Sequence, residues 1–187
     1  MTALYTLYIS DNPVTDVAPL GKLPNLNTVE AIGTDVRSVA PLKDAAGLVF
    51  LDLSSSTRLD ASSLTSLTQL RGLSIADSNL SSLTPLTNLK ALLILDVASN
   101  PDVTSAAPLG GMTSLSILSI TSTGIGDLTP IGKLTSLTQL DIDRTPVQRV
   151  APLASLTKLQ VLSAVGVSAT DWQSLDALVA GGLTILR

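Results

Sequence analysis

Leucine recurs along this chain at an almost constant interval, and the residues between the leucines repeat one order of apolar and polar positions. Successive repeats start 22 residues apart, except for one step of 23 residues. The eight repeats begin at Leu4, Leu26, Leu48, Leu70, Leu92, Leu115, Leu137 and Leu159. Counted from that leucine, positions 1, 4, 6, 11, 14, 17 and 20 are apolar, except that the third and fifth repeats insert one residue after position 9. We expect these apolar positions to point inward. A repeat of this length cannot bury its apolar side alone, and its neighbours must stack on it.

Each repeat predicts one short strand and one short helical turn. Outward and inward positions alternate from position 3 to position 8, which is strand geometry, and we expect successive strands to lie side by side in parallel. In the part of each repeat that leads back to the next strand, six of the ten prolines occur at one position. A helical turn accepts proline only in its first turn, so this position predicts the start of a short helical turn. The predicted fold class is an α/β-type repeat solenoid. It is a right-handed leucine-rich repeat coil, with a parallel β-sheet on the concave face and short 3-10 turns or loops on the convex face.

The whole chain, residues 1–187, is predicted to form a single leucine-rich repeat domain. About eight repeats span residues 4–25, 26–47, 48–69, 70–91, 92–114, 115–136, 137–158 and 159–182, and a half repeat follows at 183–187. A solenoid exposes its core at each end unless something covers it. Trp172 is predicted to plug the last repeat. For the uncapped first repeat, three explanations stay open: excision from a longer protein, an end-to-end dimer, or fraying.

Two sets of polar residues are predicted to bond to the backbone. Position 9 follows the strand and holds Asn12, Thr34, Ser56, Ser78, Asn100, Thr123 and Thr145 before it becomes Val167. These side chains suit the backbone groups left free where a strand turns, so we expect a polar ladder along one buried edge. Three residues before the recurrent proline stand Asp16, Ser38, Ser82, Ser105 and Asp127, which are good caps for the helical turns.

Composition narrows the classes of function. The chain has no histidine and no cysteine, which removes the commonest general base and the commonest nucleophile pairs, and an open strand ladder would leave its carboxylates solvated. We therefore expect no enzyme activity, no cofactor and no metal site. A net charge of −4 and the lack of a basic stripe argue against nucleic acid as a partner. No apolar run is long enough for membrane insertion, and the N-terminus lacks the pattern of a signal peptide.

The repeat is similar to the bacterial leucine-rich repeat of the internalin type. The similarity rests on segments such as 125–131, with the sequence Ile-Gly-Asp-Leu-Thr-Pro-Ile, followed by Leu134-Thr135-Ser136-Leu137, and it extends over essentially the whole chain. The resemblance implies a surface or secreted adhesin-like scaffold that binds a protein ligand on its concave face. Low lysine content and abundant serine and threonine favour an extracellular or bacterial cell-surface location. The repeat also resembles cytosolic leucine-rich regulators of phosphatases, so a cytoplasmic interaction module stays open as the alternative.

The predicted concave face is acidic. Its outward positions 3, 5, 7 and 8 hold seven of the fifteen acids and one base, Arg144. The acids are Asp11, Glu30, Asp52, Asp77, Asp96, Asp141 and Asp143. Aspartate is depleted in strands, so this enrichment needs an explanation. Two explanations are favoured: charges that keep an open sheet soluble, and a face that steers a basic protein partner. A calcium site at Glu30 with Asp52 or at Asp141 with Asp143 is the least favoured, because calcium takes six to eight oxygens and these pairs offer fewer.

Apolar residues on the same face are the expected affinity anchors. Tyr8 and Phe50 are two of only four aromatic residues, and Ile32 and Ile94 occupy outward positions nearby. Such residues also suit strands for purely structural reasons. We expect Tyr8, Phe50 and Ile94 to contact a protein ligand. The full set of candidate ligand-binding residues is Tyr8, Glu30, Ile32, Phe50, Asp52, Ile94, Asp96, Asp141, Asp143 and Arg144.

Overall fold

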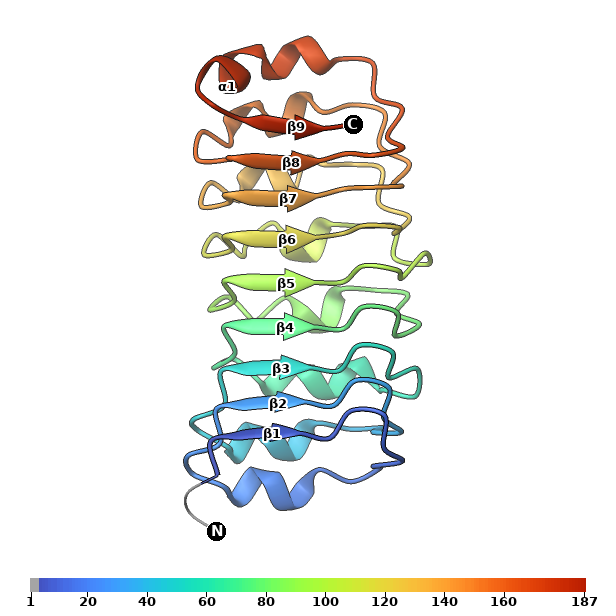
Figure 1. Cartoon of the computed structure of the whole chain (residues 1–187), viewed down its shortest axis with the longest axis vertical. Helices are drawn as coiled ribbons and strands as arrows, with labels where there is room; N and C mark the ends of the chain where they lie inside the picture. Colours follow the sequence, from blue (N-terminus) through green and yellow to red (C-terminus); the bar gives the residue numbers. More distant parts are fainter. Residues whose placement is uncertain (1–3) are drawn as a thin grey trace.

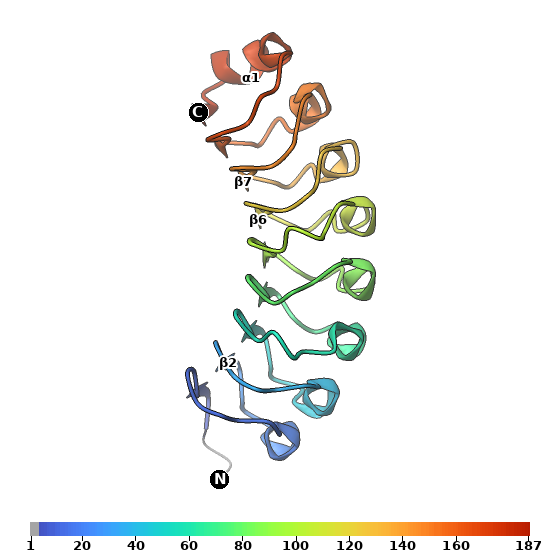
Figure 2. The same cartoon turned by 90° about the vertical axis from the view of Figure 1, so that its right-hand side faces the viewer.

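The computed structural model describes residues 4–187 and shows an arc of stacked coils. Its strands follow one another up the arc in chain order, from β1 to β9 (Figure 1). Seen from the side, the strands line the concave face and the helical turns line the convex face (Figure 2). Residues 1–3 lie outside the described residues. The predicted domain starts with them, and the expectation that the N-terminus lacks a signal peptide also concerns them.

Within residues 4–187, nine parallel strands of three residues each form one sheet. The strands are β1 (Thr6–Tyr8), β2 (Thr28–Glu30), β3 (Phe50–Asp52), β4 (Gly72–Ser74), β5 (Ile94–Asp96), β6 (Ile117–Ser119), β7 (Gln139–Asp141), β8 (Val161–Ser163) and β9 (Thr184–Leu186). Equivalent repeat positions pair across every step of the sheet, for example Leu7 with Val29 and Val29 with Leu51. Each of the eight predicted repeats contains one strand, and the half repeat contains the ninth.

The convex side consists of short 3-10 turns and one short α-helix. The 3-10 turns are η1 (Ala18–Lys22), η2 (Ala40–Asp44), η3 (Ala61–Ser66), η4 (Thr84–Leu86), η5 (Ala107–Leu109), η6 (Ile131–Lys133), η7 (Ala151–Ser155) and η8 (Trp172–Leu175), and the α-helix is α1 (Asp176–Ala180). Proline stands in the first turn of η1, η2, η4, η5 and η7, as its fixed φ and missing N–H require. The predicted fold class is confirmed.

One aliphatic core runs the length of the arc. In the second, fourth, sixth and seventh coils, all seven predicted inward positions are buried. The first coil differs, because Leu4, Leu7 and Ile9 are only partly buried against the rest of the core. At the other end, Trp172 packs against the core and its ring lies 4.8 Å from the guanidinium carbon of Arg187.

The position-9 ladder bonds to the backbone as predicted and is buried from the second to the seventh coil, but Asn12 in the first coil is exposed. Thr34, Thr123 and Thr145 are buried and donate to the carbonyl oxygen three residues earlier in the same coil. Longer-range bonds link coils: Ser78 donates to the Leu53 carbonyl, and Asn100 donates to the Ile75 carbonyl. The Asn100 amide oxygen also accepts from the N–H groups of Ser78 and Leu80. Three consecutive coils are therefore joined through two buried side chains.

The predicted caps of the helical turns accept hydrogen bonds from the N–H two residues later. Asp16 accepts from Ala18 at 2.8 Å, and Asp127 accepts from Thr129 at 2.8 Å. Bonds from Thr129 hold the pKa of Asp127 below its usual value. The capping position of the seventh coil is Arg149, a cation, which cannot accept such a bond.

Asp171 of the eighth coil supplies the missing cap of the seventh. Its two carboxylate oxygens accept from the N–H groups of Val150 and Ala151 at 2.7 and 3.1 Å, and the Arg149 guanidinium lies 3.7 Å away. Burial alone would raise the pKa of the Asp171 carboxyl. The N–H donors, with a smaller effect of Arg149, outweigh burial and hold that pKa below its usual value.

Candidate functional site

The strands are shorter than the alternation of residues predicts, which changes where three candidate residues lie. Every strand from β1 to β8 covers only positions 3 to 5 of its coil. Ile32 and Asp143, at position 7, and Arg144, at position 8, therefore lie beyond the strands, at the edge where the coil turns. At position 8 the backbone is left-handed in all eight coils, with φ of 57° at Asp11 and 53° at Arg144. The expectation that positions 7 and 8 belong to the strands is wrong, because the chain must turn there to leave the sheet.

Two rows of side chains cover the concave face. Position 3 gives a largely apolar row that includes Phe50 and Ile94, and position 5 gives a polar row that starts at Tyr8 and continues with Glu30. The expected anchors are exposed: the exposed fraction is 70% for Tyr8, 42% for Phe50 and 37% for Ile94. Large apolar side chains with this exposure are available to a partner.

The aspartates of the position-5 row have a structural role that the sequence reasoning missed. Oδ1 of Asp52, Asp96 and Asp141 accepts from the N–H two residues later, at 2.9, 2.9 and 3.1 Å. That N–H, at position 7, lies between the groups that pair with the next coil. A carboxylate at position 5 therefore caps a backbone donor where the strand ends. This role accounts for part of the aspartate enrichment without any ligand.

The remaining charged candidates are also engaged with neighbouring coils. Oδ1 of Asp143 accepts from the Ser163 hydroxyl and the Val165 N–H, both at 2.7 Å. Nε of Arg144 donates to the Ser122 hydroxyl at 3.2 Å. Within residues 4–187, the ion pairs are Arg58 with Asp35 and Arg149 with Asp171, neither on the position-3 and position-5 rows. The acids of the concave face thus keep their negative charge uncompensated by a close base in the described chain.

Five of the candidate residues line one hollow on the concave face. Its volume is about 390 Å³, and its candidate residues are Glu30, Phe50, Asp52, Ile94 and Asp96. Tyr8 lies on the neighbouring strand β1 and does not line the hollow, and Asp141, Asp143 and Arg144 belong to the seventh coil. The structure therefore divides the predicted site into a central hollow and a separate C-terminal group.

Gly72 shapes the hollow and was not among the predicted residues. It is the only glycine at position 3, so the side-chain row has a gap between Phe50 and Ile94. The Phe50 ring lies across this gap, with two ring carbons 2.2 and 2.4 Å from where a Cβ of Gly72 would be. The absence of a side chain in an otherwise continuous row was the signal that could have identified it.

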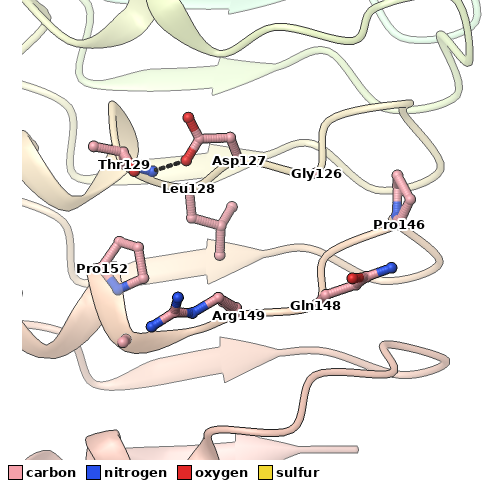
Figure 3. Close-up of a pocket in the computed structure, with 9 residues that line it drawn as sticks. Gly126, Asp127, Leu128, Thr129, Pro146, Gln148, Arg149 and Pro152 are labelled. Carbon is pink, nitrogen blue, oxygen red and sulfur yellow. Dashed lines mark hydrogen bonds between the residues drawn. The ribbon is translucent and has the colours of Figure 1, made fainter.

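A larger hollow lies away from the sheet, between the sixth and seventh coils. It has a volume of about 690 Å³ and is bordered by Asp127, Thr129, Pro146 and Arg149 (Figure 3). Its charged groups already have partners, because Asp127 caps the Thr129 N–H and Arg149 lies beside Asp171. We find no chemistry in this hollow that requires a ligand.

Among residues 4–187, no group of three or more histidine, cysteine, aspartate or glutamate residues is placed to hold a metal ion. The pairs considered for calcium, Glu30 with Asp52 and Asp141 with Asp143, fall below that number. Over the same residues, no helix has the length and apolar character needed to cross a membrane.

Comparisons with known proteins identify the architecture. No protein-family model and no curated protein sequence matches the chain. Among solved structures it is similar to internalin InlC2 of Listeria monocytogenes, with a TM-score of 0.86 and 29% identity over 96% of this chain and 80% of that one. It is also similar to internalin InlF of the same species, with a TM-score of 0.79 and 26% identity over 99% of this chain and 60% of that one.

A third similar structure shows the fold alone. It is the leucine-rich repeat protein LIC12759 of Leptospira interrogans, with a TM-score of 0.86 and 18% identity over all of this chain and 49% of that one. The chain thus spans less than two thirds of InlF and about half of the Leptospira protein. Together, the repeat, the sheet and these neighbours confirm the resemblance: the chain is similar to bacterial leucine-rich repeat proteins of the internalin type.

Proposed function

We propose that the chain is a non-catalytic scaffold that binds a protein ligand on its concave face, as part of a bacterial surface or secreted protein. The observation that carries this proposal is the exposed apolar row on an otherwise acidic sheet, with Phe50 and Ile94 beside one hollow. Apolar anchors surrounded by charged residues are the usual composition of a protein-binding face. The similarity to internalins supports a protein-interaction scaffold.

The charge of the face favours a basic protein partner over nucleic acid. The acids of the position-5 row have no ion pair within residues 4–187, so their field acts on whatever approaches. Such a field accelerates encounter with a basic protein and opposes encounter with a phosphate backbone. We therefore expect binding that weakens as salt concentration rises. Binding that is indifferent to ionic strength would contradict recognition by these acids.

Photocrosslinking tests which face binds. A photoreactive phenylalanine analogue replaces Ile94 on the concave face or, as the matched control, the exposed Thr87 on the convex face. Each protein is incubated with intact animal cells, with intact bacteria and with a bacterial cytosolic extract, then irradiated. We expect one defined crosslinked protein from the position of Ile94, absent from the position of Thr87 and found at a cell surface. Crosslinks confined to the cytosolic extract would contradict the proposed location and favour the cytoplasmic alternative.

An alanine variant tests the predicted anchors with the same partner. Replacing Tyr8, Phe50 and Ile94 together removes three exposed side chains without touching the buried core. We expect binding to fall by at least about tenfold, because truncating one anchor commonly costs 1 kcal/mol or more. Unchanged affinity in this variant would remove these three residues from the binding site.

A further inference from the structure

The hollow centred on Gly72 has an apolar side and an acidic side. The position-3 row supplies the apolar side with Phe50, Gly72 and Ile94, and the position-5 row supplies Glu30, Asp52 and Asp96. Each acid comes from a different strand, β2, β3 and β5: Asp52 and Asp96 flank the uncharged Ser74 of β4, and Glu30 lies one strand beyond Asp52. The hollow is therefore an amphipathic site and not simply a cluster of acids.

The spacing of the two rows suits a long side chain with an apolar stem and a charged end. Two residues along a strand span roughly 6.6 Å, so the acidic row lies about one extended lysine or arginine stem away from the apolar row. Such a stem packs on apolar surface while its cation stays near polar groups. A cation that enters near an aromatic ring also gains from the electrons of the ring face. Phe50 and Ile94 would contact the stem, and the carboxylates would contact the cation.

Two of the three carboxylates, those of Asp52 and Asp96, are held in place before any ligand arrives. Oδ1 of Asp52 and Oδ1 of Asp96 accept from backbone N–H groups at 2.9 Å. Within residues 4–187, Oδ2 of each has no hydrogen-bond partner and is free to accept from a ligand. A group that is already fixed loses little conformational entropy on binding. Arg71 precedes Gly72 and lies at the end of β4 away from the acidic row, so it does not neutralise these acids.

We propose that this hollow receives a lysine or arginine side chain of the protein partner. The stem lies over Ile94 and the Phe50 ring, which covers Gly72, and the cation lies between Asp52 and Asp96, with Glu30 one strand beyond Asp52. The proposal rests on the proposed function, because it names the chemistry by which the same face would recognise its partner. It assigns specificity to one hollow on the sheet and leaves the acids of the seventh coil outside the contact.

Short peptides test the hollow without the natural partner. Capped pentapeptides of glycine with a central lysine, arginine, norleucine or glutamate are titrated into the isotope-labelled 187-residue chain at low salt, and backbone amide shifts are recorded by NMR. We expect the lysine and arginine peptides to shift the amides of Gly72, Ser74 and Ile94. Norleucine, which has a similar stem without the charge, and glutamate should bind at least about fivefold more weakly, since an exposed ion pair contributes up to roughly 1 kcal/mol.

Charge-neutral variants locate the contact. The triple variant Glu30→Gln, Asp52→Asn and Asp96→Asn keeps an oxygen to accept the backbone N–H bonds, so the coil is expected to stay folded; a thermal melt checks this. We expect its affinity for the lysine peptide to fall by at least about fivefold. The matched control, Asp141→Asn with Asp143→Asn, neutralises acids of the same face outside the hollow and should leave that affinity unchanged.

Each other outcome contradicts the proposal in a distinguishable way. Equal binding of norleucine and lysine would make the hollow an apolar pocket. Equal weakening in the control variant would show attraction to the whole acidic face. Shifts of the same amides by calcium alone, with none by the peptides, would show that the hollow binds a metal ion and not a cationic side chain. If no peptide binds there while Ile94 still crosslinks to a partner, this inference fails and the proposed function stands.

Discussion

At position 8 the backbone is left-handed whichever residue occupies it. Only Gly33 and Gly166 are glycines there, and the other six coils carry a side chain at φ between 51° and 58°. That conformation costs a residue with a Cβ about 1–2 kcal/mol, whereas glycine adopts it freely. The six non-glycine residues are Asp11, Ser55, Asp77, Ser99, Ser122 and Arg144. Strain of this kind is distributed evenly along one edge of the arc.

Replacing Ser99 by glycine should therefore stabilise the protein. The Ser99 φ is 56°, and its side chain makes no hydrogen bond with the rest of the described chain. We expect the free energy of unfolding to rise by about 0.5–1 kcal/mol, after the greater flexibility of glycine in the unfolded chain is allowed for. Urea denaturation measures it. Ser119→Gly in β6, where the backbone is extended, is the control and should lower the same quantity by about 0.5–1 kcal/mol. Equal destabilisation by both variants would contradict the proposal that the left-handed backbone at Ser99 is strained.

Asn100 is the residue on which the polar ladder depends most. Its buried amide donates to Ile75 and Val97 and accepts from Ser78 and Leu80. We expect Asn100→Ala to lower the free energy of unfolding by about 2–4 kcal/mol, because buried backbone groups on both sides lose their partners. Asn88→Ala, at an exposed position, is the control and should change it by less than about 0.5 kcal/mol. A small effect at Asn100 would mean that water replaces the amide.

Some of these residue roles could be predicted and others could not. The burial of position 9 in the second to seventh coils follows from periodicity, because each coil places it at the same corner and is covered by a coil on both sides. The caps on position 7 could not be predicted in this way. They depend on a carboxylate such as Asp52 meeting an N–H that the next coil leaves unpaired, which is settled only when two coils are stacked. The same holds for Gly72, whose importance depends on the ring of Phe50 from another strand.

At the scale of one coil, the alternation of residues predicted the strand correctly but not its end. Inward positions 4 and 6 are buried in the second coil as Val29 and Ala31, yet the strand stops at position 5. The left-handed turn at position 8 requires the chain to leave the sheet early. Candidate residues at positions 7 and 8 consequently lie on the rim, and Ile32 is only partly exposed there.

The coil that contains Asp171 should be sensitive to acid. The Asp171 pKa is lowered in the folded protein, so folding favours the charged form. This stabilisation is present above the ordinary pKa of the unfolded carboxyl and is lost as pH falls toward the lower folded pKa. We expect Asp171→Asn to lower stability at pH 7 by about 1–2 kcal/mol and to reduce the loss between pH 5 and pH 2, as measured by thermal melts. Asp102→Asn, at an exposed corner, is the control. An unchanged pH profile for Asp171→Asn would contradict this role.

At the scale of the whole molecule, coils interact mainly with their neighbours, and stability need not be uniform along the arc. Ser78 and Asn100 join the third, fourth and fifth coils through buried bonds. Thr123 and Thr145 bond only within their own coils. Ser56 also donates to the Ala31 carbonyl of the second coil, so along the ladder edge the second to fifth coils are linked more strongly than the sixth and seventh.

Hydrogen exchange should reveal this difference. We expect amides between about residues 53 and 100 to exchange most slowly, and those of the first coil, whose apolar side chains are half buried, to exchange fastest. Mass spectrometry of proteolytic fragments measures it. In Asn100→Ala the protection of the central region should fall toward that of the other coils. Uniform protection along the unmodified chain would contradict a stronger centre.

An end-to-end dimer through the first coil stays a prediction. Leu4, Leu7 and Ile9 are incompletely covered, and a second copy placed against β1 would bury them. We expect the mass from light scattering to rise with protein concentration toward twice 19.2 kDa. A constant monomer mass, together with slow exchange of the β1 amides, would contradict both dimerisation and fraying of the first coil.

The left-handed turn at position 8 also bears on how this surface can vary. Most positions of a coil are constrained by the core or by the backbone bonds that their side chains make. At this rim the fold would be most stable with glycine, yet it tolerates serine, aspartate and arginine at a modest energetic cost. Each coil can therefore change the group that it displays along this edge of the arc without disturbing the core, and only exposed bonds such as that of Arg144 to Ser122 would be lost. A chain of this design could acquire new recognition properties by point substitution there, limited only by how much total stability it can lose.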